Sequence, residues 1–295
     1  MSEAASAARD LVRLVRPRDW LKNVFVLLPL PFALGGGSSV EPAALALGLV
    51  AMSLASSAAY AFNDWWDAGR DRRHPRKRER PLAAGRLPAA AGPAVSLGLA
   101  AAGTALALGL GPPPAGLIVT SYLGLQILYT LYGKHVPLVD VFLLTSGFVL
   151  RVVLGCALVG VPPSNWLLLC SSSLALLLAL AKRRADMVQG LDERHRPSLA
   201  GYSRAFLDQG LAVSAGLTIT AYALYCMDSA VLAPGREFAS LPFVVFGVME
   251  CLRIVHAEDG GGSPVDMLLS SPVLLACSFA WAGAILLSVR VSVAI

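Results

Sequence analysis

Residues 43–71 read AALALGLVAMSLASSAAYAFNDWWDAGRD, an uncharged apolar run that is followed at once by three aspartates. The run lasts about 20 residues, the length that an α-helix needs to cross the hydrocarbon core of a bilayer. A transmembrane barrel would show alternating segments of about 10 residues, whereas this run is continuous. Because backbone polar groups in lipid must be satisfied within the segment itself, the run predicts a membrane-spanning helix.

Apolar runs of this kind recur along the whole chain of 295 residues. The composition is 56% hydrophobic and 15% charged, with a mean hydropathy of +0.65, which does not suit a water-facing surface. We therefore predict an all-α polytopic membrane protein in which residues 1–295 form a single membrane-embedded domain. The nine predicted spans are residues 24–40, 43–63, 89–111, 115–133, 137–160, 164–181, 205–227, 238–252 and 267–289.

The net charge of +5 comes from 24 Lys and Arg against 19 Asp and Glu. In a soluble protein this excess would indicate nucleic acid, but here the basic residues gather near the N-terminus and in two long connections, residues 64–88 and 182–204. Loops rich in Lys and Arg face the cytoplasm. We therefore expect the N-terminus and both connections on the cytoplasmic side of the cell inner (plasma) membrane, with no nucleic-acid partner.

The three aspartates follow the pattern N-D-x-x-D-x-x-x-D at residues 63–71. At 100° per residue, Asp64, Asp67 and Asp71 lie within about 60° of one another on a helix, so their like charges repel. A divalent cation would remove that repulsion, and Mg²⁺ takes its ligands from carboxylates, water and phosphate oxygens. The pattern predicts a Mg²⁺ site at the membrane interface, with the three aspartates as metal and catalytic residues. The alternative is a loop whose charges only set the membrane topology.

Basic residues follow the aspartates without a gap. A diphosphate suits this order because its oxygens can be shared between Mg²⁺ and guanidinium or ammonium groups. We expect Arg72 to act with the aspartates in catalysis, and Lys77 and Arg80 to bind the substrate. His74, and His195 in the second connection, are predicted to have structural or hydrogen-bonding roles rather than acid and base roles.

Arg151 lies inside the predicted span 137–160, where a charge is costly unless it faces a cavity or a partner. Asp140 is in the same span, but it is about 16 Å away along the helix, too far to neutralise the guanidinium. We therefore expect a lipid phosphate or a carboxylate from another helix to do so. The alternative is that Arg151 reaches the outer membrane surface with its long side chain.

Further candidates lie where other spans meet the cytoplasm. The cations among them can bind phosphate, or their charge can serve only to set the topology. Asp186 would act as an acidic partner for the two cations before it or as a second metal contact. These candidates are Lys22, Tyr129, Lys134, Lys182, Arg183 and Asp186.

The motif at residues 63–71 resembles the first aspartate-rich motif of the UbiA superfamily of intramembrane prenyltransferases. Its extension, R-x-H-P-x-K-x-x-R-P at residues 72–81, is similar to the branch of that superfamily that transfers phosphoribosyl groups to decaprenyl phosphate. So are R-P-x-x-W-x-K-N at residues 16–23 and the basic cluster at residues 182–184. UbiA enzymes usually carry a second acidic motif after the sixth span. The cluster here is basic, which fits an anionic lipid acceptor.

The resemblance implies a nine-helix bundle that transfers the 5-phosphoribosyl group from phosphoribosyl diphosphate to a polyprenyl phosphate, such as decaprenyl phosphate. Diphosphate is released, and the product is a precursor of cell-wall arabinan. The resemblance also implies Mg²⁺ as cofactor and leaves room for a homo-oligomer such as a trimer. The expected substrate-binding residues are Lys22, Asn63, Lys77, Arg80, Tyr129, Lys134, Arg151, Lys182, Arg183, Asp186 and Tyr202.

Two alternatives stay open. A prenyltransferase of the same superfamily, which moves an isoprenoid from its diphosphate to an aromatic acceptor, would use the same Mg²⁺ site. A non-enzymatic multispan transporter or lipid scaffold would use the charged loops for docking. Transporters, however, place ionisable groups near the bilayer midplane, whereas most of the charges here lie at one interface.

Overall fold

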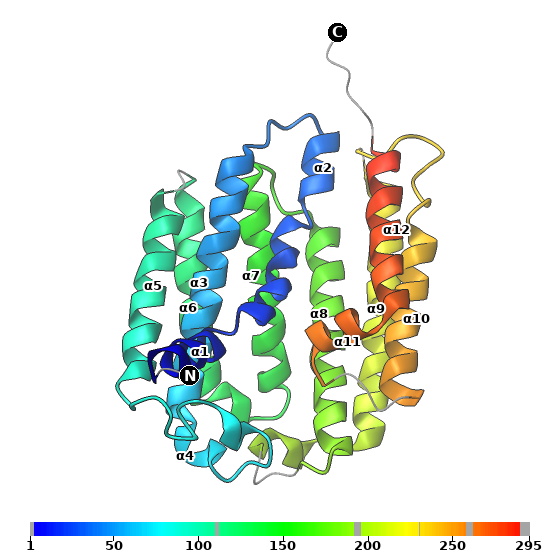
Figure 1. Cartoon of the computed structure of the whole chain (residues 1–295). Helices are drawn as coiled ribbons and strands as arrows, with labels where there is room; N and C mark the ends of the chain where they lie inside the picture. Colours follow the sequence, from blue (N-terminus) through cyan, green and yellow to red (C-terminus); the bar gives the residue numbers. More distant parts are fainter. Residues whose placement is uncertain (1–2, 110–111, 192–195, 230, 258–261, 290–295) are drawn as a thin grey trace.

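Long helices run side by side through the length of the molecule in the computed structural model (Figure 1). The structure describes residues 3–109, 112–191, 196–229, 231–257 and 262–289. The long helices are α3 (Pro42–Trp66), α5 (Ala91–Gly109), α6 (Pro113–Leu131), α7 (Val139–Leu158), α8 (Asn165–Val188), α9 (Arg204–Asp228), α10 (Leu241–Ala257) and α12 (Pro272–Ser288). The short elements are α1 (Glu3–Val15), α2 (Leu30–Gly35), α4 (Ala68–Asp71) and α11 (Pro264–Ser270), with 3₁₀ helices η1 (Pro17–Leu27), η2 (Lys77–Glu79), η3 (Gly133–His135) and η4 (Pro197–Gly201). No strand is found among the described residues, and the predicted all-α class is confirmed.

Six of these helices are long and apolar enough to cross a membrane, namely α3, α5, α6 together with η3, α7, α8 and α9. The bent pair of α11 and α12 makes a seventh if it counts as one span. The predicted number of nine is therefore not confirmed within the described ranges. The two predicted spans without such a helix are residues 238–252, where α10 is shorter at 17 residues, and residues 24–40.

The predicted span at residues 24–40 is not one helix. Its chain forms the end of η1 and, after a turn, the short α2. Pro29 and Pro31 lie at this turn, and proline cannot donate the backbone hydrogen bond of a continuous helix. η1 packs against α7 at Gly155, where a Cβ would collide with the carbonyl oxygen of Val26. The missing side chain at Gly155 lets η1 enter the bundle, where Asn23 is buried.

The predicted last span, residues 267–289, is also divided. α11 and α12 meet with a bend of 93°. The Oγ of Ser271 accepts a hydrogen bond of 3.2 Å from the backbone N–H of Leu274, and Pro272 occupies the first turn of α12. A capping serine followed by proline is a strong signal for a new helix start. α11 consequently lies across the bundle, in contact with η1 (Figure 1).

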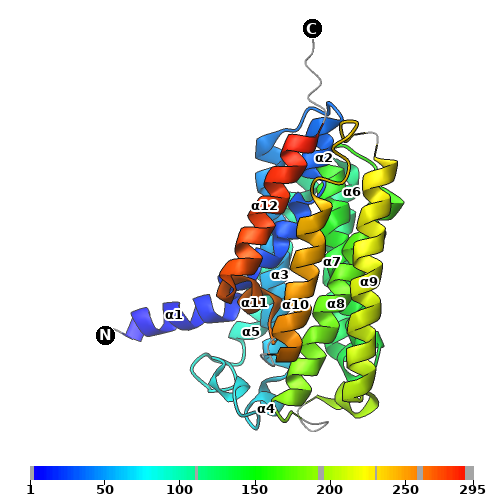
Figure 2. The same ribbon diagram turned by 90° about the vertical axis from the view of Figure 1, so that its right-hand side faces the viewer.

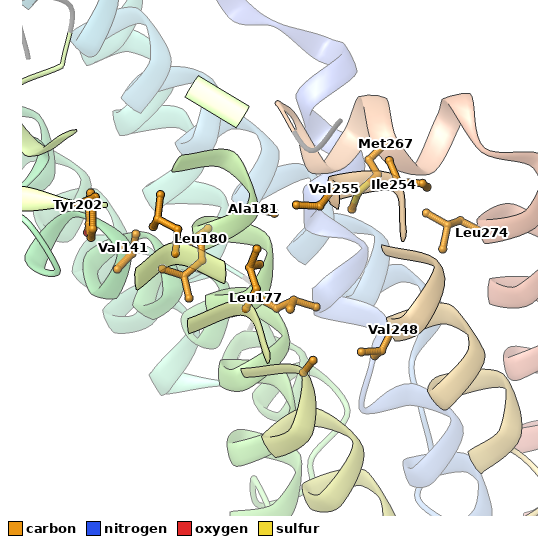
Figure 3. Close-up of a cluster of buried hydrophobic side chains, with 14 of the residues drawn as sticks. Val141, Leu177, Leu180, Ala181, Tyr202, Val248, Ile254, Val255, Met267 and Leu274 are labelled. Atoms are coloured by element: carbon orange, nitrogen blue, oxygen red, sulfur yellow. The ribbon is translucent and has the colours of Figure 1, made fainter. Parts of the chain in front are cut away.

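Two apolar clusters hold the helices together. One joins η1, α3, α5, α6 and α7, and its buried members include Met52, Val119 and Leu154. The other joins α7, α8, α9, α10, α11 and α12 (Figure 3). Small residues allow close helix contact, as at Gly103 of α5, where a Cβ would lie 2.9 Å from the carbonyl oxygen of Ala51. Because α7 contributes to both clusters, the two halves of the bundle meet along it.

The charged connections gather at one end of the bundle, the lower end in Figure 1, which we call the charged end. α8 continues to Val188, so the basic cluster at residues 182–184 is helical and the connection after it is shorter than predicted. Residues 192–195, which include His195, lie outside the described residues. α1 projects sideways near the charged end (Figure 2) and is fixed to α3 by the fully buried Leu14.

Candidate active site

A cavity of about 640 Å³ lies toward the charged end, between the half built on α3 and the half built on α8. Its wall holds three carboxylates, Asp67, Asp186 and Asp266, against nine Lys and Arg side chains. The cations are Arg16, Lys22, Arg76, Lys77, Arg80, Lys134, Arg151, Lys182 and Arg196. Such an excess of positive charge suits a ligand with several phosphate groups.

Lysine is confined to this cavity. The chain has four lysines, and all four line the wall. Arginine carries the positive charge over most of the remaining surface of the charged end. The ammonium group is a compact point charge with rotatable donors, which suits contact with phosphate oxygens. Every lysine of the chain therefore faces the cavity, together with five of its arginines.

Asp64 and Asp71 of the acidic motif share one arginine. Asp64, at the end of α3, is 2% exposed. Its Oδ1 accepts a hydrogen bond of 2.6 Å from Nη2 of Arg16 and lies 2.9 Å from Nη1 of Arg80. The same Nη1 donates to Oδ2 of Asp71 at 2.7 Å. A second cavity of about 550 Å³ is lined by Asp64 and shares Arg16, Lys77 and Arg80 with the first.

Asp67 faces a different cation. Both of its carboxylate oxygens accept hydrogen bonds of 2.6 Å from Nζ of Lys134, at the end of α6. Asn63 supports this pair, because its Oδ1 accepts from Lys134 at 3.4 Å and from Oγ1 of Thr130 at 3.5 Å. The contact fastens the end of α3 to the end of α6 and keeps Asp67 on the cavity wall.

The three carboxylates do not meet at one point, as a single continuous helix would predict. α3 ends at Trp66, Asp67 is its C-cap, and α4 begins afterwards. In the described part of the chain, no group of three or more His, Cys, Asp or Glu is placed to hold a metal ion. Two carboxylates nevertheless already bracket one positive atom, Nη1 of Arg80. Such a donor pair fits Mg²⁺, which uses one or two protein carboxylates and completes its shell with water and phosphate oxygens.

The electrostatics of this motif favour charged ligands. Burial raises the pKa of the Asp71 carboxyl above its usual value, and Asp67 and Asp64 add to the shift, while Arg80 and Lys77 oppose it. Burial lowers the pKa of the Lys77 ammonium, and Arg80 adds to that shift. A bound cation would stabilise the Asp71 carboxylate, and a bound phosphate would stabilise the charged form of Lys77.

Arg151 is buried in the middle of α7 and lines the cavity. Its guanidinium donates to Oδ1 of Asn23 and to the carbonyl oxygen of Gly147, both at 2.8 Å, to the Tyr122 hydroxyl at 3.0 Å and to the Ser56 hydroxyl at 3.2 Å. Of the two predicted partners, a carboxylate from another helix is not found among the described residues, and a lipid phosphate stays a prediction. The side chain is 4% exposed and does not extend to a membrane surface. Its positive charge therefore faces the cavity with neutral partners alone.

Arg183 and Tyr202 belong to a buried network that is not part of the cavity wall. Nε of Arg183 lies 2.8 Å from Oδ2 of Asp140, and its Nη1 donates to Oδ2 of Asp186 at 2.8 Å. The Tyr202 hydroxyl donates to Oδ1 of Asp140 at 2.6 Å and accepts from the backbone N–H of Leu138 at 2.7 Å. These contacts join α7, α8 and η4, so the geometry gives both residues a structural role.

Of the remaining predicted residues, some line the cavity and others do not. Lys22, Lys182 and Tyr129 line the cavity. Arg72 does not, because its Nε donates to the carbonyl oxygen of Ala83 at 3.3 Å and its side chain is exposed. His74 accepts hydrogen bonds of 3.2 Å at Nδ1 from the backbone N–H groups of residues 76 and 77, in keeping with the hydrogen-bonding role predicted for it.

Several cavity residues are absent from the predicted substrate-binding set. They include Arg16, Tyr60, Arg76, Tyr122, Gln126, Phe148 and Arg196. Arg16 has a left-handed backbone with φ of 54° before Pro17, and this turn points its guanidinium at Asp64. The R-P pair is a detectable signal, since a residue before proline is held out of the helical region. The aromatic and amide residues lie on apolar runs, where sequence periodicity gives no sign of a cavity.

A model of the UbiA prenyltransferase family matches residues 23–259 of the chain. Two curated relatives are named decaprenyl-phosphate phosphoribosyltransferase. The protein from Corynebacterium glutamicum is 32% identical over 297 residues, which cover 96% of this chain and 88% of the relative. The protein from Mycobacterium tuberculosis is 32% identical over 289 residues, which cover 94% of this chain and 93% of the relative.

Solved structures of UbiA homologues share the fold. The homologue from Archaeoglobus fulgidus bound to DMAPP and Mg²⁺ superposes with a TM-score of 0.74 and 18% identity, covering 96% of this chain and 99% of that chain. The apo homologue from Aeropyrum pernix K1 gives a TM-score of 0.69 and 16% identity, covering 90% of this chain and 97% of that chain. At this level of identity the likeness supports the fold alone.

Proposed function

The chain belongs to the UbiA prenyltransferase family and is an integral membrane protein, and on this premise we propose that it is a phosphoribosyltransferase. It transfers the 5-phosphoribosyl group from phosphoribosyl diphosphate to a polyprenyl phosphate such as decaprenyl phosphate, and it releases diphosphate. The relatives that are 32% identical over most of the chain carry a name that describes this reaction.

The observation that carries the proposal is the charge distribution around the cavity. Nine cations, together with Asn63 and Asp67 of the acidic motif, line a cavity of about 640 Å³. The donor has a diphosphate and a 5-phosphate, and the acceptor has a further phosphate, so the two substrates together need more cationic contacts than an uncharged acceptor would. This requirement favours the phosphoribosyl reaction over prenyl transfer to an aromatic acceptor.

The reaction is a displacement at the anomeric carbon. An oxygen of the lipid phosphate forms a bond to this carbon from one side, and the bond to the diphosphate oxygen breaks on the other, inverting the centre. Diphosphate leaves with the electron pair. A phosphate is already anionic at neutral pH, so no general base is required, and the chain's residues act by positioning and charge stabilisation. Arg80, Lys77 and Lys134 stabilise the negative charge that grows on the leaving group.

Mg²⁺ is the metal of this proposal; Asp64 and Asp71 would hold it, and Asp67, which pairs with Lys134, is the third predicted ligand. When bound, it supplies Lewis-acid stabilisation of the departing diphosphate. The bracketing of one Arg80 nitrogen by Asp64 and Asp71 supports the assignment. Without metal, Arg80 keeps these two buried carboxylates from repelling each other.

The proposal includes the location of the site. The clustering of Lys and Arg at the charged end supports a cytoplasmic site in the plasma membrane, because positive loops stay on that side. Phosphoribosyl diphosphate is a water-soluble polyanion and would enter from there. The arabinan pathway and the trimer stay predictions.

The rival prenyltransferase would need a second acidic contact at the charged end of α8 for the diphosphate of its donor. Asp186 is the candidate in the described ranges, and its Oδ2 already accepts a hydrogen bond of 2.8 Å from Arg183. Arg196 lies 3.8 Å from the same oxygen. Residue 190, one helical turn beyond Asp186, is glycine and not the second carboxylate of an acidic motif.

One assay separates the candidate functions. Purified protein receives labelled phosphoribosyl diphosphate, decaprenyl phosphate and Mg²⁺, and the label in the lipid phase is counted. Mg²⁺-dependent label supports the proposal. Transfer that occurs only with prenyl diphosphate and an aromatic acceptor would support the rival, and no transfer in either mixture would favour a transporter or scaffold.

Asp67→Asn tests the acidic motif in the same assay. We expect turnover to fall by at least about 100-fold, because the substitution removes the charge that Lys134 and the metal share. Membrane insertion is expected to be unchanged. Glu41→Gln, at an exposed carboxylate outside both cavities, is the control. Unchanged turnover in Asp67→Asn would refute the metal assignment.

A further inference from the structure

The cavity has two chemically different walls. The α3 wall presents polar groups, Tyr60, Asn63 and Asp67. The α8 wall changes character along the helix, from Leu178 and Ala179 to Lys182 and then Asp186 and Gln189. Residues three and four apart share one helix face, so Lys182 lies one turn beyond the apolar pair. An amphipathic ligand would find its apolar and anionic contacts in this order on α8.

Apolar contacts extend from this part of α8 onto two other helices. Ile254 of α10 and Met267 of α11 also line the cavity. Both belong to the apolar cluster that contains Leu177, Leu180 and Ala181 of α8, and Figure 3 shows Ile254 and Met267 side by side. The wall next to Lys182 is therefore suited to a hydrocarbon chain, whereas the acidic motif lies on the opposite half of the bundle.

Two ammonium groups of the cavity differ from the other cations. Those of Lys77 and Lys182 make no hydrogen bond or ion pair with any residue that the structure describes. By contrast, Lys134 is bound to Asp67, and Lys22 donates to Oδ1 of Asp19 at 2.5 Å and to the Tyr60 hydroxyl at 3.4 Å. Both side chains are half-buried in the cavity wall, where an ammonium group without a counter-charge is costly, so each of the two is a position for an anion.

The carboxylate closest to Lys182 along α8 makes its short ion pair with another residue. Oδ2 of Asp186 accepts from Arg183 at 2.8 Å, and Arg183 is in turn bound to Asp140. Lys77 is in a different position, because it lies on the connection that carries the acidic motif and influences the carboxyl of Asp71. One unpartnered ammonium group therefore accompanies the acidic motif and the other accompanies the apolar wall.

We infer that Lys182 binds the phosphate of the lipid acceptor, while Lys77 serves the donor. This inference rests on the proposed function and divides its two substrates between the two walls. The isoprenoid lies along Leu178, Ile254 and Met267, and its phosphate reaches the ammonium group of Lys182. The acceptor oxygen thereby approaches the anomeric carbon from the side opposite the acidic motif, as an inverting displacement requires.

Steady-state kinetics test this division. Initial rates are measured with decaprenyl phosphate and phosphoribosyl diphosphate varied in turn. Lys182→Gln should raise the KM for decaprenyl phosphate roughly 10-fold or more, since a charged hydrogen bond is lost, and should leave the donor KM within about twofold. Lys77→Gln should show the reverse pattern, and Lys182→Arg should recover most of the acceptor affinity. A rise in the donor KM for Lys182→Gln, or no change in either KM, would overturn the inference.

Arg73→Gln is the matched control. Arg73 is exposed at the same end and does not line the cavity, so its substitution removes the same charge without touching either wall. Both KM values should match those of the wild type. An acceptor KM that rises as much as in Lys182→Gln would mean that net charge, and not a contact at Lys182, governs lipid binding.

A binding measurement separates failure of the inference from failure of the proposed function. Thermal stabilisation by decaprenyl phosphate is compared with that by uncharged decaprenol, which needs no transfer reaction. The wild type should prefer the phosphate, and Lys182→Gln should lose that preference. Should this variant fail to fold, Lys182→Met replaces it in both measurements. A variant without Lys182 that keeps the full preference would refute the phosphate contact even if the enzyme is active.

Discussion

Arg151 and Arg183 are both buried arginines in neighbouring helices, α7 and α8, but their partners are of opposite kinds. Arg183 lies 2.8 Å from a carboxylate oxygen of Asp140 and 2.8 Å from one of Asp186. Arg151 is held by an amide oxygen, two hydroxyls and a carbonyl oxygen. The first charge is neutralised within the protein and the second is not. The comparison teaches that burial alone does not indicate function, whereas the charge of the partners does.

The largest expected effect concerns Arg183, whose charge is neutralised within the protein. Arg183→Met removes the shortest ion pair of Asp140 and of Asp186 and leaves them with Arg196 at 3.7 and 3.8 Å, and removing one partner of a buried ion pair costs about 3–5 kcal/mol. The melting temperature in detergent should fall by at least about 6 °C. Adding Asp140→Asn should restore part of the loss. A variant with unchanged melting temperature and a raised substrate KM would instead give Arg183 a binding role.

Arg151→Leu tests the buried arginine whose hydrogen-bond partners are all neutral. No carboxylate in the described part of the chain loses its partner, so the melting temperature should stay within about 4 °C of the wild type. Transfer activity should fall roughly 10- to 100-fold, because a cavity cation that can contact phosphate is lost. Activity and melting temperature are measured on the same preparation. A fully active and more stable variant would show that the charge of Arg151 serves no substrate.

The smallest expected effect concerns Tyr202, which belongs to the same buried network as Arg183. Tyr202→Phe removes the hydrogen bond of 2.6 Å to Asp140 and the acceptor for the N–H of Leu138. The cost should be about 1–2 kcal/mol, with a fall in melting temperature of about 2–6 °C and both KM values unchanged. Tyr132→Phe, at an exposed tyrosine, is the control. A change in KM without a change in melting temperature would return Tyr202 to the substrate-binding set.

Helix positions were predictable where a run is apolar and has no proline beyond its first turn. α3, α5, α6, α7 and α9 follow such runs closely, because span length is set by bilayer thickness. The predictions were wrong near Pro29 and Pro272, where proline divides an apolar run into separate helices. The end of α8 was also misplaced, since charge was taken as a sign of a loop although α8 continues through Lys182 and Arg183.

The candidate site was predictable in its residue types but not in its pairings. Spacing along a helix brought Asp64, Asp67 and Asp71 together, and each is indeed buried at the charged end. That Asp67 turns to Lys134, 67 positions later, is a matter of how α3 and α6 meet. Sequence spacing carries no information about such a contact.

The amino-acid sequence by itself determined the membrane-spanning class, the end of the bundle where charge collects and the acidic motif with its basic extension, because each depends on local composition and helix periodicity. The tertiary structure decided which cations are neutralised and which face the cavity. Arg151 meets Asn23 across 128 positions, and Arg183 meets Asp140 on a neighbouring helix. Electrostatic energy depends on distance in space and on burial, and neither quantity is set until the helices have packed.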